Sequence, residues 1–149
     1  NIVVACDGSR HAGQAAAMAG TLARALGATL HLVHVFPGTV AELVGMPGAS
    51  AQMLGLARFE QQDLDALAEQ SAAEAFAVAD QVLADAAAGT VRKRLAGDPA
   101  TELVAYAHAL DAPMLVLGPR GRGYVGELLL GSVTHSVLHK ARCPVLVAH

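Results

Sequence analysis

Residues 118–134 read GPRGRGYVGELLLGSVT and run from the end of a predicted apolar strand into the start of a predicted helix. Glycine lets a backbone approach an anion without interference from a Cβ atom. A helix that starts at Ser132-Val-Thr134 offers hydroxyl groups, N–H groups without intrahelical acceptors and the positive end of the helix dipole. The segment is typical of a phosphate-binding loop, so a nucleotide is the first ligand to consider.

Around this segment the chain alternates between strand-like and helix-like stretches. Aliphatic or β-branched runs predict strands at Ile2 to Cys6, Thr29 to Phe36, Val91 to Ala96, Met114 to Leu117 and Val145 to Ala148. Ala, Leu, Glu and Gln at helical spacing predict helices at His11 to Leu26, about Arg58 to Ala88, Pro99 to Leu110 and Ser132 to Ala141. We therefore predict the α/β class: one doubly wound domain over residues 1–149, with five parallel strands and helices on both faces.

Three local features sharpen this prediction. Gly27 stands where the first helix needs a left-handed C-terminal residue, and Asp98-Pro99 supplies an N-cap followed by the preferred first helical residue. Pro37 to Ala57 is long for a connection in a compact domain and contains several glycines. It is interpreted either as a flap over the ligand or as a surface excursion without a role.

The predicted topology indicates a place for a ligand. Ligands of open parallel sheets bind outside the carboxyl ends of the strands where the strand order reverses, and the common order 3-2-1-4-5 reverses between strands 1 and 4. Those two ends are the polar, glycine-rich exits of the chain. They hold Ala5, Asp7, Gly8 and Ser9 on strand 1 and Leu117, Gly118, Arg120 and Gly121 on strand 4.

Two common nucleotide motifs do not account for this site. The loop lacks the Gly-x-x-x-x-Gly-Lys-Ser/Thr order of P-loop NTPases. Gly121, Gly123 and Gly126 match the string G-x-G-x-x-G, but they follow the fourth strand instead of opening the first crossover. The site is therefore neither a P-loop nor a Rossmann dinucleotide site.

A different signature matches the glycines of this loop. Gly118-x2-Gly121-x9-Gly131-Ser132 matches the G-2x-G-9x-G-S/T motif, and the chain resembles the ATP-binding universal stress proteins that carry it. The resemblance covers essentially the whole chain, because the opening Ile-Val-Val-Ala-Cys-Asp-Gly-Ser, the Gly97-Asp98-Pro99 exit and the closing Cys-Pro-Val-Leu-Val also look like that family. It implies a fold like that of the adenine-nucleotide α-hydrolases.

The resemblance also implies ATP or a related adenine nucleotide, with or without Mg²⁺, between strands 1 and 4. Asp7 would lie near the ribose or adenine, and Val35 at the exit of strand 2 would flank the base. The residues expected around the phosphates are Gly118, Gly121, Gly131, Ser132, Val133 and Thr134. Their chemistry is compatible, since a carboxylate accepts hydrogen bonds from hydroxyl and amino groups while backbone N–H groups and hydroxyls donate to oxyanions.

Several of these residues have a second interpretation. Asp7 is also suited to be an N-cap or a turn residue, and Ser132 to be a plain N-cap. Arg120 either contacts phosphate or is solvated. Pro119 stands where many relatives have a small hydroxylated residue. Proline lacks an N–H donor and has a fixed φ, so phosphate binding by the loop is expected to be either weaker or more rigid.

Composition excludes several classes of function. The chain has 149 residues, 54% of them hydrophobic, with a formal net charge of −3, so we predict no binding to nucleic acid or to an anionic membrane. It has no apolar run of membrane-spanning length, and we expect no signal peptide. Cys6 and Cys143 lack a C-x-x-C spacing and are expected to be reduced, buried thiols in a cytoplasmic protein.

Other constellations support an enzyme or a metal site poorly. His135 and His139 are four apart on a predicted helix, but no carboxylate lies inside the pair and Pro144 disfavours Cys143 as a third ligand, so no metal site is predicted. Ser9 forms no recognisable set of nucleophile, base and orienting group with any histidine.

The sequence therefore favours a nucleotide-dependent regulatory protein with at most slow ATP hydrolysis, and the resemblance implies a stress-response role. The alternatives are a nucleotide-free dimeric interaction module of the same fold and a small ATP-using enzyme of the adenine-nucleotide α-hydrolase group. We expect a homodimer through the apolar final strand, Val145 to Ala148, and a protein partner whose identity stays open.

Overall fold

The computed structural model describes residues 1–45, 61–83, 89–121 and 130–149. In these ranges, strands form one sheet in the order β3-β2-β1-β4-β5, and every neighbouring pair is parallel. Their bounds are Ile2–Ala5 for β1, Leu30–Phe36 for β2, Val91–Ala96 for β3, Met114–Leu117 for β4 and Val145–Val147 for β5. The predicted fold class and strand order are confirmed.

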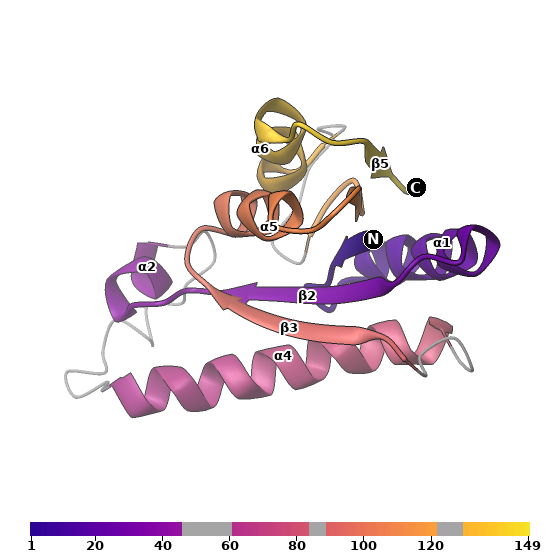
Figure 1. The fold of residues 1–149 in the computed structure, drawn as a ribbon. Helices are drawn as coiled ribbons and strands as arrows, with labels where there is room; N and C mark the ends of the chain where they lie inside the picture. The colour runs from indigo at the N-terminus through magenta and orange to yellow at the C-terminus, as the bar shows by residue number, and fades with distance from the viewer. Residues whose placement is uncertain (46–60, 84–88, 122–129) are drawn as a thin grey trace.

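Helices cover both faces of the sheet. One face carries α1 (Arg10–Leu26) and α4 (Gln61–Leu83), and the other carries α5 (Pro99–His108) and α6 (Ser132–Lys140). Figure 1 shows α4 below strands β2 and β3, with α5 and α6 above them. None of the helices in the described ranges is long and apolar enough to cross a membrane.

The core follows from the two-residue period of the strands. Val4 and Leu32 point toward α1 and α4, whereas Val3, Val33 and Leu115 point toward α5 and α6. All five side chains are buried. The strands therefore need no polar face, which explains their nearly continuous apolar sequence.

The described ends of the predicted strands and helices lie within two residues of their predicted positions. β1 ends at Ala5 instead of Cys6, and β5 ends at Val147 instead of Ala148. A short helix, α2 (Val40–Gly45), follows β2 inside the predicted excursion Pro37 to Ala57, where the sequence pattern predicts no helix. Residues 46–57 of that excursion and both ends of the helix predicted for Arg58 to Ala88 lie outside the described residues.

Side chains cap the starts of two helices, and a glycine ends one of them. Ser9 is the N-cap of α1 and accepts a hydrogen bond from the N–H of Ala12 at 3.1 Å. Gly27 ends α1 in the left-handed conformation, with φ of 60°. Asp98 caps α5 by accepting from the N–H of Thr101 at 2.9 Å, and Pro99 follows it as the first helical residue. The predicted caps at Gly27 and Asp98 are confirmed.

Asp98→Ala is expected to lower the free energy of unfolding by about 1 kcal/mol at pH 7, because the α5 cap is lost. The hydrogen bonds from the side chain and backbone of Thr101, with the nearby charge of Lys140, lower the pKa of the Asp98 carboxyl. A lowered folded pKa means that the ionised cap stabilises the fold above about pH 4 and that this advantage disappears as the pH falls further. Urea unfolding between pH 7 and pH 3 measures the loss.

Asp98→Asn is the matched control, since asparagine caps helices but does not titrate. The difference in stability between the wild type and the Asp98→Asn variant should shrink as the pH falls through the carboxyl titration. An equal difference at pH 7 and pH 3 would contradict the assigned role of the ionised carboxyl.

Candidate functional site

The exits of β1 and β4 lie side by side. The two strands pair in parallel, with Val4 opposite Val116, so their carboxyl ends reach the same edge of the sheet. The strand order continues from β1 to β2 on one side and from β4 to β5 on the other, which makes this the point where the order reverses. The place predicted for a ligand is therefore the region between these two exits.

At the exit of β1, Asp7 forms a tight turn. Its Oδ1 accepts a hydrogen bond from the N–H of Ser9 at 2.9 Å, and Gly8 takes a positive φ of 77° that favours glycine. Of the two local roles left open for Asp7, the turn is confirmed. The N-cap interpretation is wrong, because Ser9 caps α1.

At the exit of β4, Gly118 touches the main chain of α1. A Cβ atom added to Gly118 would lie 2.8 Å from the backbone carbon and oxygen of His11. This approach is closer than van der Waals contact permits, so only glycine fits between β4 and the first turn of α1. Gly118 thus sets how closely the two exits approach each other.

Gly121 brings the exit of β4 to the Asp7 carboxylate. A Cβ atom added to Gly121 would lie 2.5 Å from Oδ2 of Asp7. Asp7 and Gly121 are far apart in the sequence, and their contact confirms that the two predicted polar exits form one local arrangement.

The first turn of α6 is hydrogen-bonded to the exit of β4. The N–H of Gly131 donates to the carbonyl of Pro119 at 2.7 Å, and the hydroxyl of Thr134 donates to the carbonyl of Gly118 at 2.8 Å. Because the single hydroxyl proton of Thr134 is engaged there, this side chain joins the loop to α6 in the structure. The two bonds place the helix N-terminus beside the exit of β4.

Gly131, and not Ser132, is the N-cap of α6. Gly131 has extended backbone angles, with φ of −74° and ψ of 160°, and no side chain caps the helix. The interpretation of Ser132 as an N-cap is therefore wrong, since Ser132 is the first helical residue and is exposed. In an α-helix the first N–H groups have no intrahelical acceptor, so the N-terminus of α6 can donate hydrogen bonds to an anion.

The remaining predicted residues lie at or near the ends of the strands and in the segments that follow. Ala5 and Leu117 are the last residues of β1 and β4, and Val35 is the next-to-last residue of β2. Val133 packs partly against the core beneath α5 and α6, and Arg120 is half-buried. Residues 122–129, the middle of the predicted loop, lie outside the described residues.

The cysteines do not provide a nucleophile. Burial, with the charge of Asp7, raises the pKa of Cys6 to about 12, so this residue is a thiol and not a thiolate at neutral pH. Cys6 and Cys143 are both free, as predicted. The expectation that both are buried is wrong for Cys143, which is partly exposed; burial still raises its pKa.

The histidine pair on α6 lies on the surface. His135 and His139 are exposed, and their Nε2 atoms are 3.3 Å apart. Within the described parts of the chain, no three His, Cys, Asp or Glu side chains are arranged to hold a metal ion. The pair is therefore a surface hydrogen bond with no third protein ligand among those residues.

Sequence reasoning missed two residues that shape the site. The backbone of His11 is the surface against which Gly118 packs, and Nδ1 of His34 lies 2.7 Å from the carbonyl oxygen of Cys6. Both contacts depend on how distant strands and helices meet. The sequence contains no local signal for either one.

Comparison with known proteins agrees with this fold. The model of the universal stress protein family matches residues 1–149. The chain is similar to a universal stress protein in the QAH/OAS sulfhydrylase 3′ region of Thermus aquaticus, with 37% identity over 146 residues that cover 98% of this chain and 96% of that protein.

Solved structures show the same similarity. Universal stress protein UspA from Lactobacillus plantarum is 26% identical, with a TM-score of 0.72 over 100% of this chain and 97% of that chain. A universal stress protein solved in complex with cAMP is 26% identical, with a TM-score of 0.64 over 99% of this chain and 95% of that chain. A nucleotide complex therefore occurs in a protein with this fold.

Proposed function

This chain belongs to the universal stress protein family, and from that premise we propose that it binds an adenine nucleotide, ATP in particular, in the crevice between β1 and β4. In this proposal the nucleotide regulates the protein, and the bound form is read by a protein partner in a stress response. The similar structure that contains cAMP supports an adenine ligand. The site of this chain supplies the more specific arguments.

The conformation of Gly131 carries the proposal. Its backbone angles are accessible to any residue, and among the described residues a Cβ atom there would meet its nearest neighbour, Cα of Arg120, at an ordinary 3.4 Å. The fold itself therefore does not require glycine at this position, in contrast to Gly118. A missing side chain beside the uncapped N-terminus of α6 leaves space for a phosphate to approach the backbone.

Asp7 supplies the complementary recognition of the sugar or base. Its carboxylate lies at the exit of β1 and faces Gly121 of the phosphate loop. A carboxylate accepts hydrogen bonds, so it suits ribose hydroxyls or the adenine amino group and repels phosphate. This polarity favours a nucleotide whose base end lies toward β1 and β2 and whose phosphates lie toward α6.

The residues present favour binding over turnover. Phosphoryl transfer needs a group that positions water and metal ions that neutralise the phosphates. Cys6 is a buried thiol with a raised pKa, and Asp7 is engaged in the turn with Ser9. Mg²⁺ keeps several waters and binds through phosphates, so it would be held mainly by the ATP itself. We therefore expect hydrolysis to be slow.

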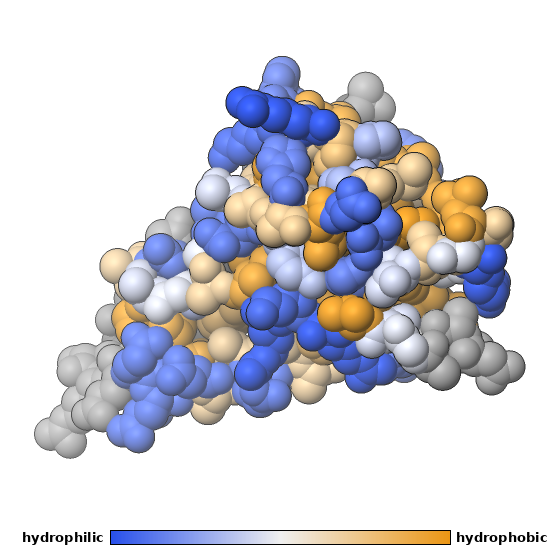
Figure 2. Space-filling view, viewed as in Figure 1, coloured by the Kyte–Doolittle hydropathy of each residue, from blue (hydrophilic) through white to orange (hydrophobic). Residues whose placement is uncertain are grey.

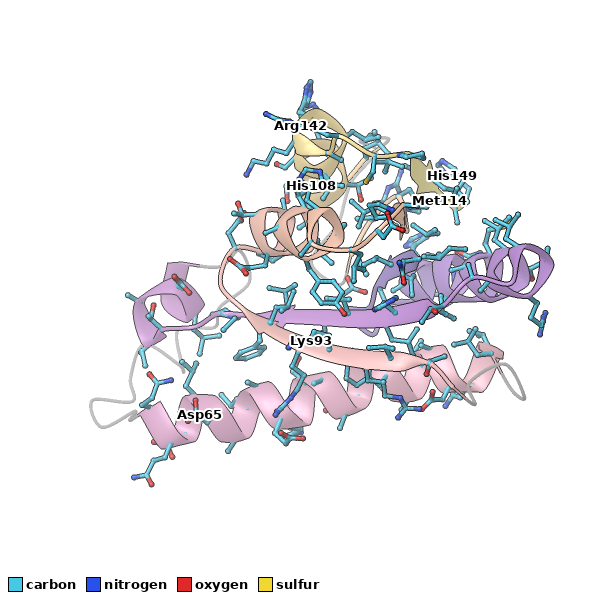
Figure 3. The ribbon with its side chains drawn as sticks, in the orientation of Figure 1. Asp65, Lys93, His108, Met114, Arg142 and His149 are labelled. Carbon is cyan, nitrogen blue, oxygen red and sulfur yellow. The ribbon has the colours of Figure 1, made fainter. Side chains whose placement is uncertain are left out.

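The two edges of the sheet support a homodimer through β5. The β3 edge carries the consecutive basic side chains Arg92, Lys93 and Arg94, of which Figure 3 labels Lys93. Arg92 and Arg94 form ion pairs with Asp80 and Glu69 of α4. Charged side chains protect an edge strand from pairing.

The β5 edge has no such charges, because it reads Val-Leu-Val. Its side chains are partly exposed, and Figure 2 shows hydrophobic and hydrophilic residues interspersed in this region. The N–H of Arg142 donates to Nε2 of His108 at 3.0 Å and fixes the chain just before β5; Figure 3 labels the two residues close together. Sedimentation at twice the chain mass of 15.2 kDa supports this dimer, and sedimentation at 15.2 kDa contradicts it.

The first test is to denature the purified protein and identify any released nucleotide by chromatography. Nucleotide-free protein is then titrated with ATP, AMP, cAMP and GTP by calorimetry. We expect saturable binding of adenine nucleotides, weaker binding of GTP and slow release of phosphate from ATP.

Each alternative predicts a different result. Absence of binding by the folded wild-type protein would contradict the proposal and favour the nucleotide-free interaction module. Rapid, repeated turnover of ATP would favour the ATP-using enzyme.

A further inference from the structure

His34 is a buried histidine near the end of β2. Its side chain is 5% exposed and lies on the face of the sheet that α1 and α4 cover, with its ring 6.5 Å from the ring of Phe76 on α4. Nδ1 lies 2.7 Å from the carbonyl oxygen of Cys6. Because a carbonyl can only accept, Nδ1 carries the proton and donates it to Cys6.

The hydrogen bond from His34 to Cys6 replaces the next backbone hydrogen bond of the sheet between β1 and β2. The N–H of Cys6 donates to the carbonyl of Val33 at 2.8 Å. In a regular parallel ladder the next bond would run from the N–H of Val35 to the carbonyl of Cys6. The side chain of His34 donates to that carbonyl instead, and β1 ends one residue earlier, at Ala5.

The backbone of Cys6 is thus held at both its N–H and its carbonyl group. The peptide group that contains this carbonyl also contains the N–H of Asp7, and a planar peptide fixes the two directions together. Asp7 then continues into its turn with Ser9 and places Oδ2 against Gly121. The direction in which Asp7 leaves β1 therefore depends on the hydrogen bond from His34.

We propose that His34 is a positioning residue for the nucleotide site. Its Nδ1–H holds the carbonyl of Cys6, separates the exit of β1 from that of β2, and sets Asp7 between Val35 and Gly121, where it meets the ribose or adenine. The inference rests on the proposed function, because the ligand is the adenine nucleotide of that site. Beyond that function, it assigns a role in nucleotide binding to a buried residue that does not contact the ligand.

Two substitutions at His34 distinguish the effect of its N–H donor from the effect of its side-chain volume. His34→Asn retains an N–H donor on the atom that branches from Cγ, where His34 has Nδ1. His34→Leu retains apolar volume and has no donor. In His34→Leu the Cys6 carbonyl is either left without this donor or pairs with the N–H of Val35, and the second outcome draws the exits of β1 and β2 together.

His31 provides a matched control in the same strand. It is 6% exposed, and its Nδ1 and Nε2 atoms lie 2.9 Å from the hydroxyl of Tyr106 and 3.0 Å from Oδ1 of Asn1. It lies at the opposite end of β2 from the crevice. His31→Leu therefore removes a buried, hydrogen-bonded imidazole without touching the exit of β1.

The experiment measures ATP affinity by calorimetry, unfolding by urea, and amide hydrogen exchange in nucleotide-free protein at Cys6 and Ser9, whose N–H groups donate to Val33 and to Asp7. We expect His34→Leu to weaken ATP binding by about tenfold or more, which corresponds to about 1.4 kcal/mol. We expect His34→Asn and His31→Leu to stay within about threefold of the wild type. Exchange at Cys6 and Ser9 should be faster in His34→Leu than in the other three proteins.

Two results would overturn the inference. One is an ATP affinity of His34→Leu equal to that of His31→Leu at similar stability; the other is unchanged exchange at Cys6 and Ser9. Failure of the wild type to bind any adenine nucleotide contradicts the proposed function instead. The exchange rates then still decide whether His34 holds the exit of β1.

Discussion

Gly118→Ala is expected to lower the free energy of unfolding by about 3 kcal/mol, the upper part of the range for overpacking a rigid site. The new Cβ would lie 2.8 Å from the backbone carbon and oxygen of His11, and also 2.8 Å from its Cβ. None of these atoms is the flexible end of a side chain, so relief requires that β4 or α1 shift. Such a shift would also strain the hydrogen bond from Thr134 to the carbonyl of Gly118.

Equilibrium unfolding in urea measures this loss, and Gly131→Ala in the same loop is the control. Its Cβ would have its nearest contact at 3.4 Å, and its backbone is in an extended conformation. We expect Gly131→Ala to stay within about 1 kcal/mol of the wild type, because alanine is a poorer N-cap but loses less backbone entropy on folding. Equal losses in the two variants would show that packing against His11 does not explain Gly118.

Sequence pattern predicts the parts of this fold that depend on local regularity. The apolar strands around Val4, Leu32 and Val116 and the alternation with helices predict the doubly wound sheet. The glycine motif predicts a phosphate loop between β4 and α6, and in the structure the bond from Gly131 to Pro119 joins these two segments. These features follow from chain order and the rules of parallel sheets.

Contacts between distant segments limited the prediction of the site. Capping preferences favour Ser132 as the N-cap, but Gly131, whose N–H donates to the carbonyl of Pro119, takes that position, and α6 begins at Ser132 as predicted. The bond from His34 to Cys6 depends on the register of β2 beside β1. A one-residue change in register would turn His34 to the other face, so its role could not be inferred before the pairing was known.

The second large effect is expected for Gly131→Val, which should weaken ATP binding by roughly 100-fold, or about 2.7 kcal/mol, at a stability close to that of Gly131→Ala. Valine suits the extended backbone at this position. Its methyl groups would project beside the first turn of α6 and occupy the space through which phosphate oxygens reach the helix N–H groups. Calorimetric titration of nucleotide-free protein measures the loss.

Adenosine is the control ligand for this variant, because it has the base and ribose but no phosphates. Adenosine affinity should differ by less than about threefold between wild type and Gly131→Val, while ATP affinity in the variant falls toward that of adenosine. Ser132→Ala removes one hydroxyl and keeps the backbone N–H, so a smaller loss of about tenfold or less is expected. An equal loss of affinity for adenosine and ATP in Gly131→Val would show that the valine disturbs the whole nucleotide site. Wild-type affinity for ATP in this variant would show that the phosphates do not lie at the N-terminus of α6.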